Sequence, residues 1–407
     1  MKTHLTFILC LLSGSVLALP NRVVVQGGDS DQTNVIVTFD APKGLLEGKI
    51  GLLTAKDGTA IPVQEDESGH ASFIAPSIPK GTKQTYIFSQ ADAIAGVTAV
   101  DVTKGAGILN FAASGHPIFS YQMEAGEVPK GVPAIFKHGA HLHPVYSPGG
   151  RLVTGNHPPD HRWHRGIWMA WTDTEFEGQH PDFWNEGKGD GPDHSGDKLL
   201  AEVRFDSLVS SWSGPVHGGF VSKHRFVDYN SGKPKDVLKE TWQVTAYAIT
   251  WGPKPMYVID LVSTQTCAGD SPLKLPKYYY GGLGLRGNED WNPVDKVTML
   301  TSNGDDRTKG DSTKGKWVYM GGSVKGGPTG IAVLIHPGNF RFPQPLRLNP
   351  KNPQLCIAPS QDGDWSIEPG KPVVSKYRFI VCDGTPDAAL LERAWQNYGA
   401  PLKVTLE

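Results

Sequence analysis

Short runs of β-branched and aromatic residues recur along most of the chain, separated by turn-forming residues. In the first hundred positions these runs are residues 23–25, 35–37 and 86–88, and an Asp57-Gly58 turn lies among them. β-Branched and aromatic side chains suit a pleated strand, and Asp-Gly suits a tight turn because glycine accepts a positive φ. We therefore predict a small β-sandwich-like domain over residues 19–103.

The region from residue 104 to residue 407 continues the pattern in longer strands. Residues 240–247 alternate, with Trp, Val and Ala on one side and Thr, Gln and Tyr on the other, as in a half-buried strand. Residues 256–262, 330–335 and 377–381 have the same strand-like character. Their spacing predicts an all-β fold, a large antiparallel β-sandwich that follows the smaller N-terminal domain.

One helix is predicted close to the C-terminal end. Thr385 is expected to be its N-cap, Pro386 its first residue, and Asp387 the acid near the positive end of the helix dipole. Beyond them, apolar residues recur at helical spacing as far as Gly399, which favours the end of a helix. This apolar stripe, which we expect to pack on the core, is Leu391, Trp395 and Tyr398.

Residues 1–18 predict an export signal peptide. Lys2 precedes an apolar core from Leu5 to Leu12, and small or apolar residues up to Ala18 occupy the positions that signal peptidase recognises. We expect cleavage after Ala18 and a periplasmic or secreted protein. An uncleaved anchor is the alternative, but a membrane-spanning helix needs roughly 20 apolar residues. No later stretch is that long, so no membrane span is expected after cleavage.

Composition narrows the classes of partner. The formal charge of -2 and the absence of a basic run make nucleic acid a poor partner. The 48 glycines and 32 prolines suit many short strands joined by turns. Cys267, Cys356 and Cys382 lie far apart, so at most one disulfide could form. Three buried free thiols are the favoured interpretation.

Candidate chemistry is concentrated in one segment. Eight of the fourteen histidines lie between His138 and His194, among several tryptophans and acids. Imidazole can hold or pass a proton near neutral pH, and carboxylates accept hydrogen bonds from hydroxyl groups. Indole rings cover the C–H faces of sugar rings. The mixture predicts a polar ligand site whose partner is a carbohydrate or another polyhydroxylated molecule.

The loop at residues 158–164 carries the strongest catalytic candidates. Two prolines stiffen the backbone before Asp160 and His161. We expect His161 or His164 to act as base or acid, and Asp160 or the distant Glu289 to supply the complementary carboxylate. The alternative is that these histidines are structural and bind backbone groups.

Further candidates surround this loop or lie downstream. Arg165 and Arg286 are expected to orient an anionic or polyhydroxylated substrate, because guanidinium offers a planar fork of donors. An Arg286–Glu289 ion pair within the loop is the alternative for the second arginine. The other residues predicted to bind substrate are His143, His157, Trp168, Asn292, His336 and Arg341.

Metal and cofactor motifs are weak. His161 and His164 are three residues apart, a spacing that can hold a metal on a helical turn, but the segment lacks cysteine and an HExxH pattern. The glycines at residues 281–287 do not fit a dinucleotide-binding pattern. We therefore expect no cofactor and no metal, and a bound divalent metal ion is the alternative.

Several motifs resemble the bacterial family labelled "methane oxygenase PmoA". The resemblance covers residues 113–384, and its most specific part is the loop motif at residues 158–168. The motifs are His143-Pro-Val-Tyr146, Pro158-Pro-Asp-His161, His164-Arg165-Gly166-Ile167-Trp168, Gly282-Leu-Gly-Leu-Arg286-Gly and His336-Pro-Gly-Asn339.

The resemblance implies a fold more clearly than it implies an activity. A methane-oxidising membrane subunit needs long apolar helices, which this chain lacks, so oxygenase activity is not expected. Family members often carry an acid and a hydroxyl residue after a Trp-Val pair, whereas here Trp317-Val318 is followed by Tyr-Met-Gly-Gly. The proteins are also similar to galactose-mutarotase-like β-supersandwich proteins, which use histidine and carboxylate pairs on sugars.

Taken together, the residues and the resemblance predict an extracytoplasmic carbohydrate-active enzyme on a β-supersandwich. Hydrolysis, elimination and epimerisation all need a base, an acid and a group that stabilises developing charge. A non-catalytic glycan-binding protein of the cell envelope is the main alternative. A structural envelope protein without a small ligand is a third hypothesis.

Overall fold

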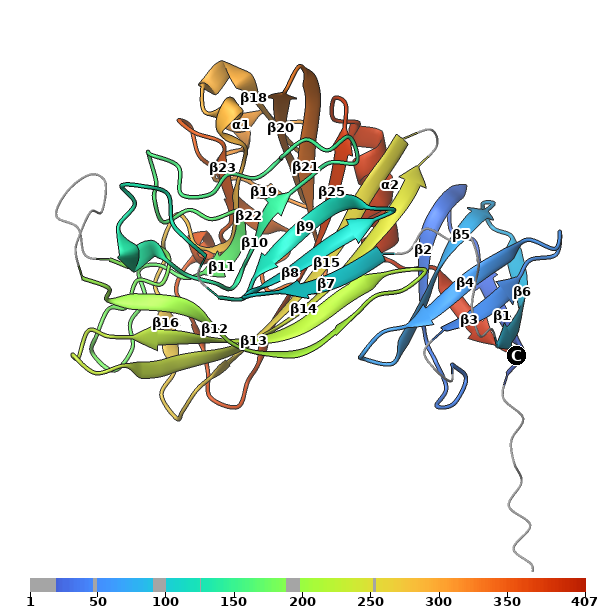
Figure 1. The fold of residues 1–407 in the computed structure, drawn as a ribbon, viewed down its shortest axis with the longest axis horizontal. Helices are drawn as coiled ribbons and strands as arrows, with labels where there is room; N and C mark the ends of the chain where they lie inside the picture. The colour runs from blue at the N-terminus through green and yellow to red at the C-terminus, as the bar shows by residue number, and fades with distance from the viewer. Residues whose placement is uncertain (1–19, 47–49, 91–99, 125, 188–197, 252–253) are drawn as a thin grey trace, which may run out of the picture.

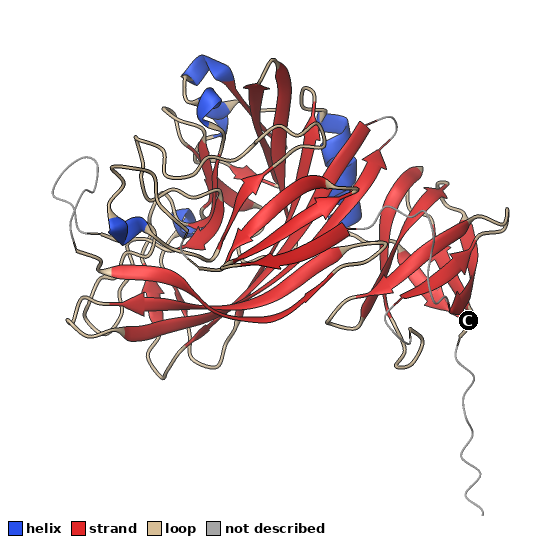
Figure 2. Ribbon diagram, in the orientation of Figure 1, coloured by secondary structure: helices blue, strands red, loops and turns tan. Residues whose placement is uncertain are grey.

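Strands dominate the computed structural model, and the few helices lie around them (Figures 1 and 2). It describes residues 20–46, 50–90, 100–124, 126–187, 198–251 and 254–407, so the predicted signal peptide lies outside the described residues. Three large antiparallel sheets confirm the all-β prediction. Within the described ranges, no helix is long and apolar enough to cross a membrane.

The first large sheet has nine strands in the order β19-β22-β23-β17-β11-β10-β9-β8-β7. Sequence neighbours pair at one end, and distant segments pair at the other. Its strands are β7 (Val100–Gly105), β8 (Ile108–Ala113), β9 (His116–Gln122), β10 (His141–Val145), β11 (Ile167–Ala170), β17 (Gly282–Arg286), β19 (Lys314–Gly315), β22 (Gln344–Leu348) and β23 (Gln354–Ile357).

The second large sheet has eight strands in the order β12-β13-β14-β15-β25-β21-β20-β18. A separate two-stranded ladder joins β16 (Leu273–Leu275) to β24 (Trp365–Ile367). The eight strands are β12 (Ala201–Trp212), β13 (Gly218–Asp228), β14 (Lys235–Trp251), β15 (Lys254–Cys267), β18 (Val297–Thr301), β20 (Trp317–Val324), β21 (Gly327–Ile335) and β25 (Val373–Asp383).

The main core contains inward-facing side chains from both sheets. Alternation in β14 buries Trp242 and Val244 completely, as the sequence pattern predicts. The same alternation buries Glu240, which would be costly without partners. Its carboxylate lies 2.9 Å from His224 Nδ1 and accepts a 2.6 Å hydrogen bond from Ser263, so the charge is satisfied inside the core.

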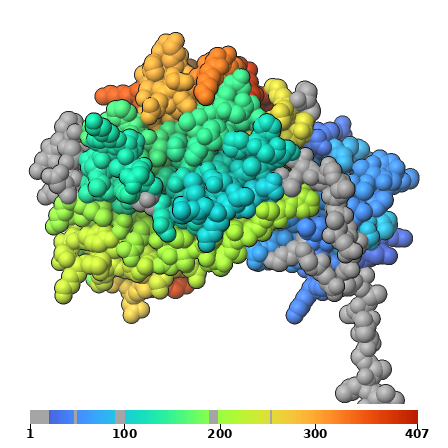
Figure 3. Space-filling view, in the orientation of Figure 1, coloured from blue at the N-terminus to red at the C-terminus, as the bar shows by residue number. Residues whose placement is uncertain are grey.

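The N-terminal domain is a seven-stranded sheet in the order β2-β5-β4-β3-β6-β1-β26, with its own apolar core. In Figure 3 it stands out, in blue, beside the large domain. Gln64 Nε2 donates to the carbonyl of His217 across the junction at 3.0 Å. The strands are β1 (Arg22–Gln26), β2 (Gln32–Asp40), β3 (Ile50–Thr54), β4 (Ala60–Glu65), β5 (His70–Ile78), β6 (Lys83–Gln90) and β26 (Lys403–Leu406).

Two strands do not follow the predicted domain boundary at residue 103. Strand β7 already begins at Val100 and pairs with β8 in the nine-stranded sheet. Strand β26, at the end of the chain, returns to pair with β1, where Val404 lies opposite Val25. The N-terminal domain therefore needs residues from both ends of the chain.

Replacing Val404 by aspartate is expected to destabilise the N-terminal domain by about 1–3 kcal/mol, because Val404 packs on its core and the new charge would be partly buried. Hydrogen exchange of the amides in β1 measures this loss. Thr405→Asp is the matched control, since Thr405 is exposed on the same edge strand. Equal exchange rates in the two variants would contradict the assigned role of β26.

The helices are short except for one. They are α1 (Arg307–Gly310), α2 (Ala388–Gly399) and the 3-10 turns η2 (Ala134–Phe136), η3 (Glu289–Trp291), η4 (Val294–Lys296) and η5 (Pro359–Asp362). The predicted helix is α2, but its N-cap is Asp387, not Thr385. The Asp387 carboxylate accepts from Leu390 N at 2.9 Å and so satisfies a free amide of the first turn.

The three cysteines of the described chain are free thiols, as predicted, but only one of them is buried. Cys356 is buried, and Cys267 and Cys382 are half-buried. The fold therefore relies on its sheets and cores, with no disulfide among the described residues.

Candidate functional site

Four adjacent strands, β11, β17, β23 and β22, support the candidate site, and β22 and β23 contribute Arg347 and Gln354 to its lining. Their register sets Trp168 opposite Gly284, Gly284 opposite Cys356, and Cys356 opposite Arg347. Directly opposed residues share a face of the sheet. The glycine is required here, because a Cβ at Gly284 would lie 2.7 Å from Trp168 and 2.8 Å from Trp184. These two indoles therefore pack closely against the strand at Gly284, with their ring centroids 4.7 Å apart.

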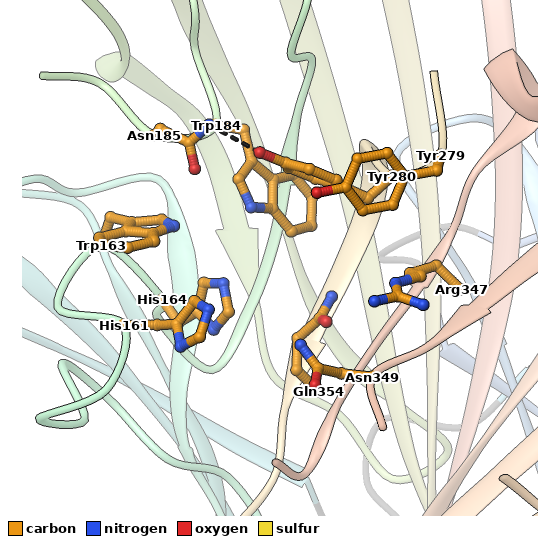
Figure 4. A pocket seen from close by; sticks show the side chains of 10 residues that line it. All are labelled: His161, Trp163, His164, Trp184, Asn185, Tyr279, Tyr280, Arg347, Asn349 and Gln354. Atoms are coloured by element: carbon orange, nitrogen blue, oxygen red, sulfur yellow. Dashed lines mark hydrogen bonds between the residues drawn. The ribbon is translucent and has the colours of Figure 1, made fainter. Parts of the chain in front are cut away.

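A cavity of about 140 Å³ opens beside these strands (Figure 4). It is smaller than the roughly 300–1,000 Å³ of drug-sized ligand pockets, so it suits a single small ring. The lining combines aromatic rings, amides, two histidines and one arginine: His161, Trp163, His164, Trp184, Asn185, Tyr279, Tyr280, Arg347, Asn349 and Gln354.

Asp160 is the fixed anion behind the cavity wall. Arg286 donates to both of its oxygens, at 2.7 and 3.0 Å, and Asn352 Nδ2 donates at 2.8 Å. Burial alone would raise the pKa of Asp160, but the hydrogen bonds from His161 and Arg286 outweigh it and hold that pKa well below its usual range. Asp160 is therefore a carboxylate throughout the neutral range.

His161 lies between this carboxylate and the cavity. Its Nδ1 is 2.9 Å from Asp160 Oδ2 and 3.3 Å from Asn352 Nδ2. Asn352 Nδ2 donates at the shorter distance of 2.8 Å to Asp160, and a carboxylate can only accept, so we assign the proton to Nδ1. Nε2 then holds the free lone pair and has no hydrogen-bond partner among the described residues. The side chain is 31% exposed, so a ligand in the cavity can reach it.

His164 stacks on His161, with ring centroids 4.6 Å apart. Burial, together with the charges of His161 and Arg286, holds the pKa of His164 well below its ordinary value. Its Nδ1 lies 3.5 Å from Arg286 Nη1, a geometry that suits a neutral ring. His164 therefore supports its neighbour as a neutral imidazole.

Aromatic side chains close the opposite side of the cavity. Tyr280 packs edge-on against Trp184 at 5.5 Å, and Asn185 Nδ2 donates to the Tyr280 hydroxyl at 2.9 Å, as the dashed line in Figure 4 marks. Burial raises the pKa of Tyr280 far above its usual value. Its hydroxyl therefore stays protonated and can donate a hydrogen bond to a ligand.

Arg165 belongs to a separate buried ion network, although the sequence suggests a role in substrate binding. Its guanidinium donates to Glu186, whose second oxygen lies 3.1 Å from His138 Nε2. His138 Nδ1 contacts Glu202 at 2.9 Å. Arg165 and Glu186 are each almost fully buried, so the network holds the loop after β11 in place and does not line the cavity.

The network predicts a pH-dependent stability. Burial lowers the pKa of His138, but the charge of Glu186 and the hydrogen bonds to Glu186 and Glu202 prevail and raise it above 6.5. A raised histidine pKa contributes stability that is full below pH 6.5 and is lost as the pH rises through the folded value. We expect the stability difference between wild type and His138→Gln, measured by urea unfolding, to be largest below pH 6.5 and to shrink as the pH rises above that value. A difference that is constant with pH would contradict a charged His138.

Two of the predicted residues line another cavity. His143 and Glu289 lie with Asn156 and Asp290 around a space of about 470 Å³. Burial lowers the pKa of His143 to about 4, and its Nδ1 contacts Thr154 Oγ1 at 2.9 Å. The predicted pairing of Glu289 with His161 is therefore not what the structure shows, because the two residues line different cavities.

The remaining predicted residues make contacts within the protein. Asn292 accepts from Arg286 at 2.6 Å, and His157 Nδ1 contacts the carbonyl of Arg162 at 2.6 Å. Arg341 donates to the carbonyls of Pro359 and Gly363, and His336 packs against Tyr398. Arg286 is itself fully buried, so neither it nor these residues lines the His161 cavity, and only His161 and His164 of the predicted set do so.

Four polar residues of the lining are not among those predicted from the sequence: Asn185, Arg347, Asn349 and Gln354. The last three belong to β22, β23 and the turn between them, which contains two Asn-Pro pairs. Polar residues in a proline-rich turn at strand ends are the signal that could have pointed to them. That signal is weaker than a histidine cluster.

Within the described ranges, no three His, Cys, Asp or Glu side chains are grouped to hold a metal ion. The arrangement around the cavity instead offers a proton acceptor, hydrogen-bond donors and aromatic faces.

Comparison with known proteins identifies a family that matches most of the chain. Residues 109–396 match the family described as "Family of unknown function (DUF6807)". The chain belongs to the DUF6807 family. The match covers nearly all of the large domain, including every residue that lines the His161 cavity. No curated protein matches this DUF6807 chain.

One solved structure similar to this DUF6807 protein is a TPR-domain containing protein from Parabacteroides distasonis ATCC 8503. It shares 11% identity, with a TM-score of 0.18, and the alignment covers 91% of this chain and 57% of that chain. The chain thus spans a little over half the length of that protein. A TM-score this low carries no argument about fold or function.

Proposed function

We propose that this DUF6807 protein is a carbohydrate-active enzyme in which His161 removes a proton from a sugar ring. The observation that carries the proposal is the Asp160–His161 pair, whose free Nε2 faces a cavity with aromatic and amide walls. A histidine oriented by an ionised aspartate is a suitable general base near neutral pH. The aromatic rings suit the C–H faces of a sugar.

The lining favours elimination or epimerisation over hydrolysis. Most glycoside hydrolases place two carboxylates on either side of the scissile bond, about 5–9.5 Å apart. Among the described residues no carboxylate lines the His161 cavity, and Asp160 is bound to Arg286. A reaction that begins with proton transfer to imidazole needs no such pair.

The proposed steps account for the proton and for the electron pair of the C–H bond. His161 Nε2 takes a ring proton, and the C–H electron pair is released. In elimination that pair forms a C=C bond while the adjacent C–O bond breaks, and the Tyr280 hydroxyl can protonate the leaving oxygen. In epimerisation the pair is held as an enolate by a carbonyl or carboxylate of the sugar next to that carbon, and a proton from water returns to the same carbon on its other face.

An exported location and a galactose-mutarotase-like relationship are part of the same proposal. The apolar start of the chain and the histidine–carboxylate pair on a large antiparallel sandwich support them. In this setting the substrate is an extracytoplasmic glycan.

The test is incubation of the purified protein with a panel of neutral and acidic oligosaccharides, followed by mass spectrometry and NMR. Elimination gives an unsaturated product without added water, epimerisation gives an isomer of unchanged mass, and hydrolysis adds water. An unsaturated or epimerised product supports the proposal. Binding without any product overturns the proposed enzyme activity and favours the glycan-binding alternative. The aromatic walls of Trp163, Trp184 and Tyr280 are the observation that supports this alternative.

A further inference from the structure

The His161 cavity has a cationic side. Arg347 lines it across from His161 and His164, and Figure 4 shows its guanidinium turned toward the space between them. In the part of the chain that the structure describes, none of the residues that line the cavity is an acid. A site built for neutral hydroxyls usually gains from carboxylate acceptors, whereas this one offers mainly donors. Its electrostatics therefore favour a ligand that carries negative charge.

Arg347 keeps part of its donor capacity for a ligand. Its Nη1 donates to Asp311 at 2.5 Å, and Leu348 N fixes the other oxygen of Asp311 at 2.9 Å. The ring of Tyr279 lies 5.3 Å from the guanidinium carbon. Nε and Nη2 have no hydrogen-bond partner among the described residues. The side chain is thus held on one edge and open on the other.

Two amides add donors beside Arg347. Asn349 Oδ1 accepts from Lys351 N at 2.9 Å, which leaves its Nδ2 as the group free to bind a ligand. Gln354 is 3% exposed, and its buried Nε2 has no oxygen or nitrogen partner in the described protein, although the side chain interacts with the Cys356 thiol. An unsatisfied buried donor is costly, and a ligand acceptor would satisfy it. All three groups belong to β22, β23 and their turn.

The arginines that the sequence suggests for this role are already used inside the protein. Arg165 donates to Glu186, and Arg286 donates to both oxygens of Asp160. Arg347 is the arginine that lines the cavity within the described chain.

We propose that the ligand is a carboxylate-bearing sugar of the uronic acid class, whose carboxylate binds Arg347 with help from Asn349 and Gln354. This inference rests on the proposed function and names its substrate class. Charge-assisted donors on the carboxylate would also stabilise the negative charge that develops when His161 removes the proton on the adjacent carbon. One side of the cavity thus holds the acid group and the other takes the proton.

The experiment measures binding separately from turnover, by calorimetry with D-galacturonate and D-glucuronate against D-galactose and D-glucose. Wild type is expected to bind at least one uronate more tightly than its neutral partner. Arg347→Gln is expected to weaken uronate binding about 10- to 100-fold, the usual value of a charge-assisted contact, and to leave neutral sugars unchanged. Arg347→Lys keeps the charge without the fork and is expected to lose less.

The matched control is Arg225→Gln, which removes an arginine paired to Asp206 at 2.8 Å on the other large sheet. Unfolding midpoints of all variants show that they are folded. Equal binding of uronates and neutral sugars by wild type, including no binding of either, overturns the inference. So does an equal loss in the Arg225 and Arg347 variants. Uronate binding through Arg347 without any turnover would keep this inference and overturn the enzyme, whereas turnover of neutral glycans alone would do the reverse.

Discussion

Replacing Glu186 by glutamine is expected to destabilise the large domain by about 3–5 kcal/mol, because Arg165 would keep its charge in a buried site without a counterion. Glutamine preserves shape and one acceptor, so the loss reports charge and not a cavity. All eleven tryptophans lie between Trp163 and Trp395, so tryptophan fluorescence during urea unfolding follows this domain. The midpoint should fall while the slope stays constant.

Glu177→Gln is the matched control for this experiment. Glu177 also has a positive φ, near 48° against 67° for Glu186, and is ion-paired, to Lys235. Its side chain is exposed, so the change should cost less than about 1 kcal/mol. Adding Arg165→Met to the Glu186 variant should recover stability, since removing both charges removes the unpaired one. An unchanged midpoint in Glu186→Gln would show that the network does not stabilise the domain.

The sequence is a good guide to the strands because alternation records which side chains face a core. The run at residues 240–247 lies within β14, and its even positions are buried as the pattern predicts, although Thr245 and Tyr247 on the opposite face are buried as well. Glycine and proline turns separate the strands in the same way. This information is local, since it depends on the two-residue period of each strand and not on its partner.

The alternation does not show which distant strand each strand pairs with. Strand β26 is four residues long and pairs with β1 across almost the whole chain, and nothing in its composition identifies that partner. The N-cap of α2 depends on a similar detail. Thr385, Pro386 and Asp387 all suit a helix start, and only the hydrogen bond from Leu390 N shows that Asp387 is the cap.

The candidate site likewise combines residues that are close in sequence with one that is distant in sequence. Asp160, His161 and His164 share one stiff loop, so sequence proximity identifies them together. Arg347 is nearly two hundred residues away and reaches the cavity only because β22, β23 and β17 are adjacent in the sheet.

The histidine cluster also suggests more cavity residues than exist. His138, His141 and His157 are buried and held by carboxylates or backbone carbonyls inside the fold. Burial gives them structural roles in the same segment that supplies His161. Density of histidines along the chain therefore identifies the segment but cannot choose the residues within it.

On a glycan that the protein converts, His161→Ala is expected to reduce kcat by about 100- to 10,000-fold, the usual contribution of a positioned general base. Binding should change little, because Arg347, the amides and the aromatic walls stay in place. Added imidazole should restore part of the activity by occupying the space that the side chain leaves. The pH profile supplies a further readout, since the limb that reports His161 should disappear from kcat/KM.

His70→Ala is the matched control for His161. His70 Nδ1 lies 2.7 Å from Asp40, so it is also a histidine paired to an aspartate, but it lies in the N-terminal domain. Its replacement should leave kcat and the pH profile unchanged. Full activity of the His161 variant on the same glycan would rule out His161 as the base, because Nε2 is the only uncommitted imidazole nitrogen that the Asp160 carboxylate orients among the described residues. Loss of kcat with neither imidazole rescue nor a changed pH profile would instead assign His161 a structural role.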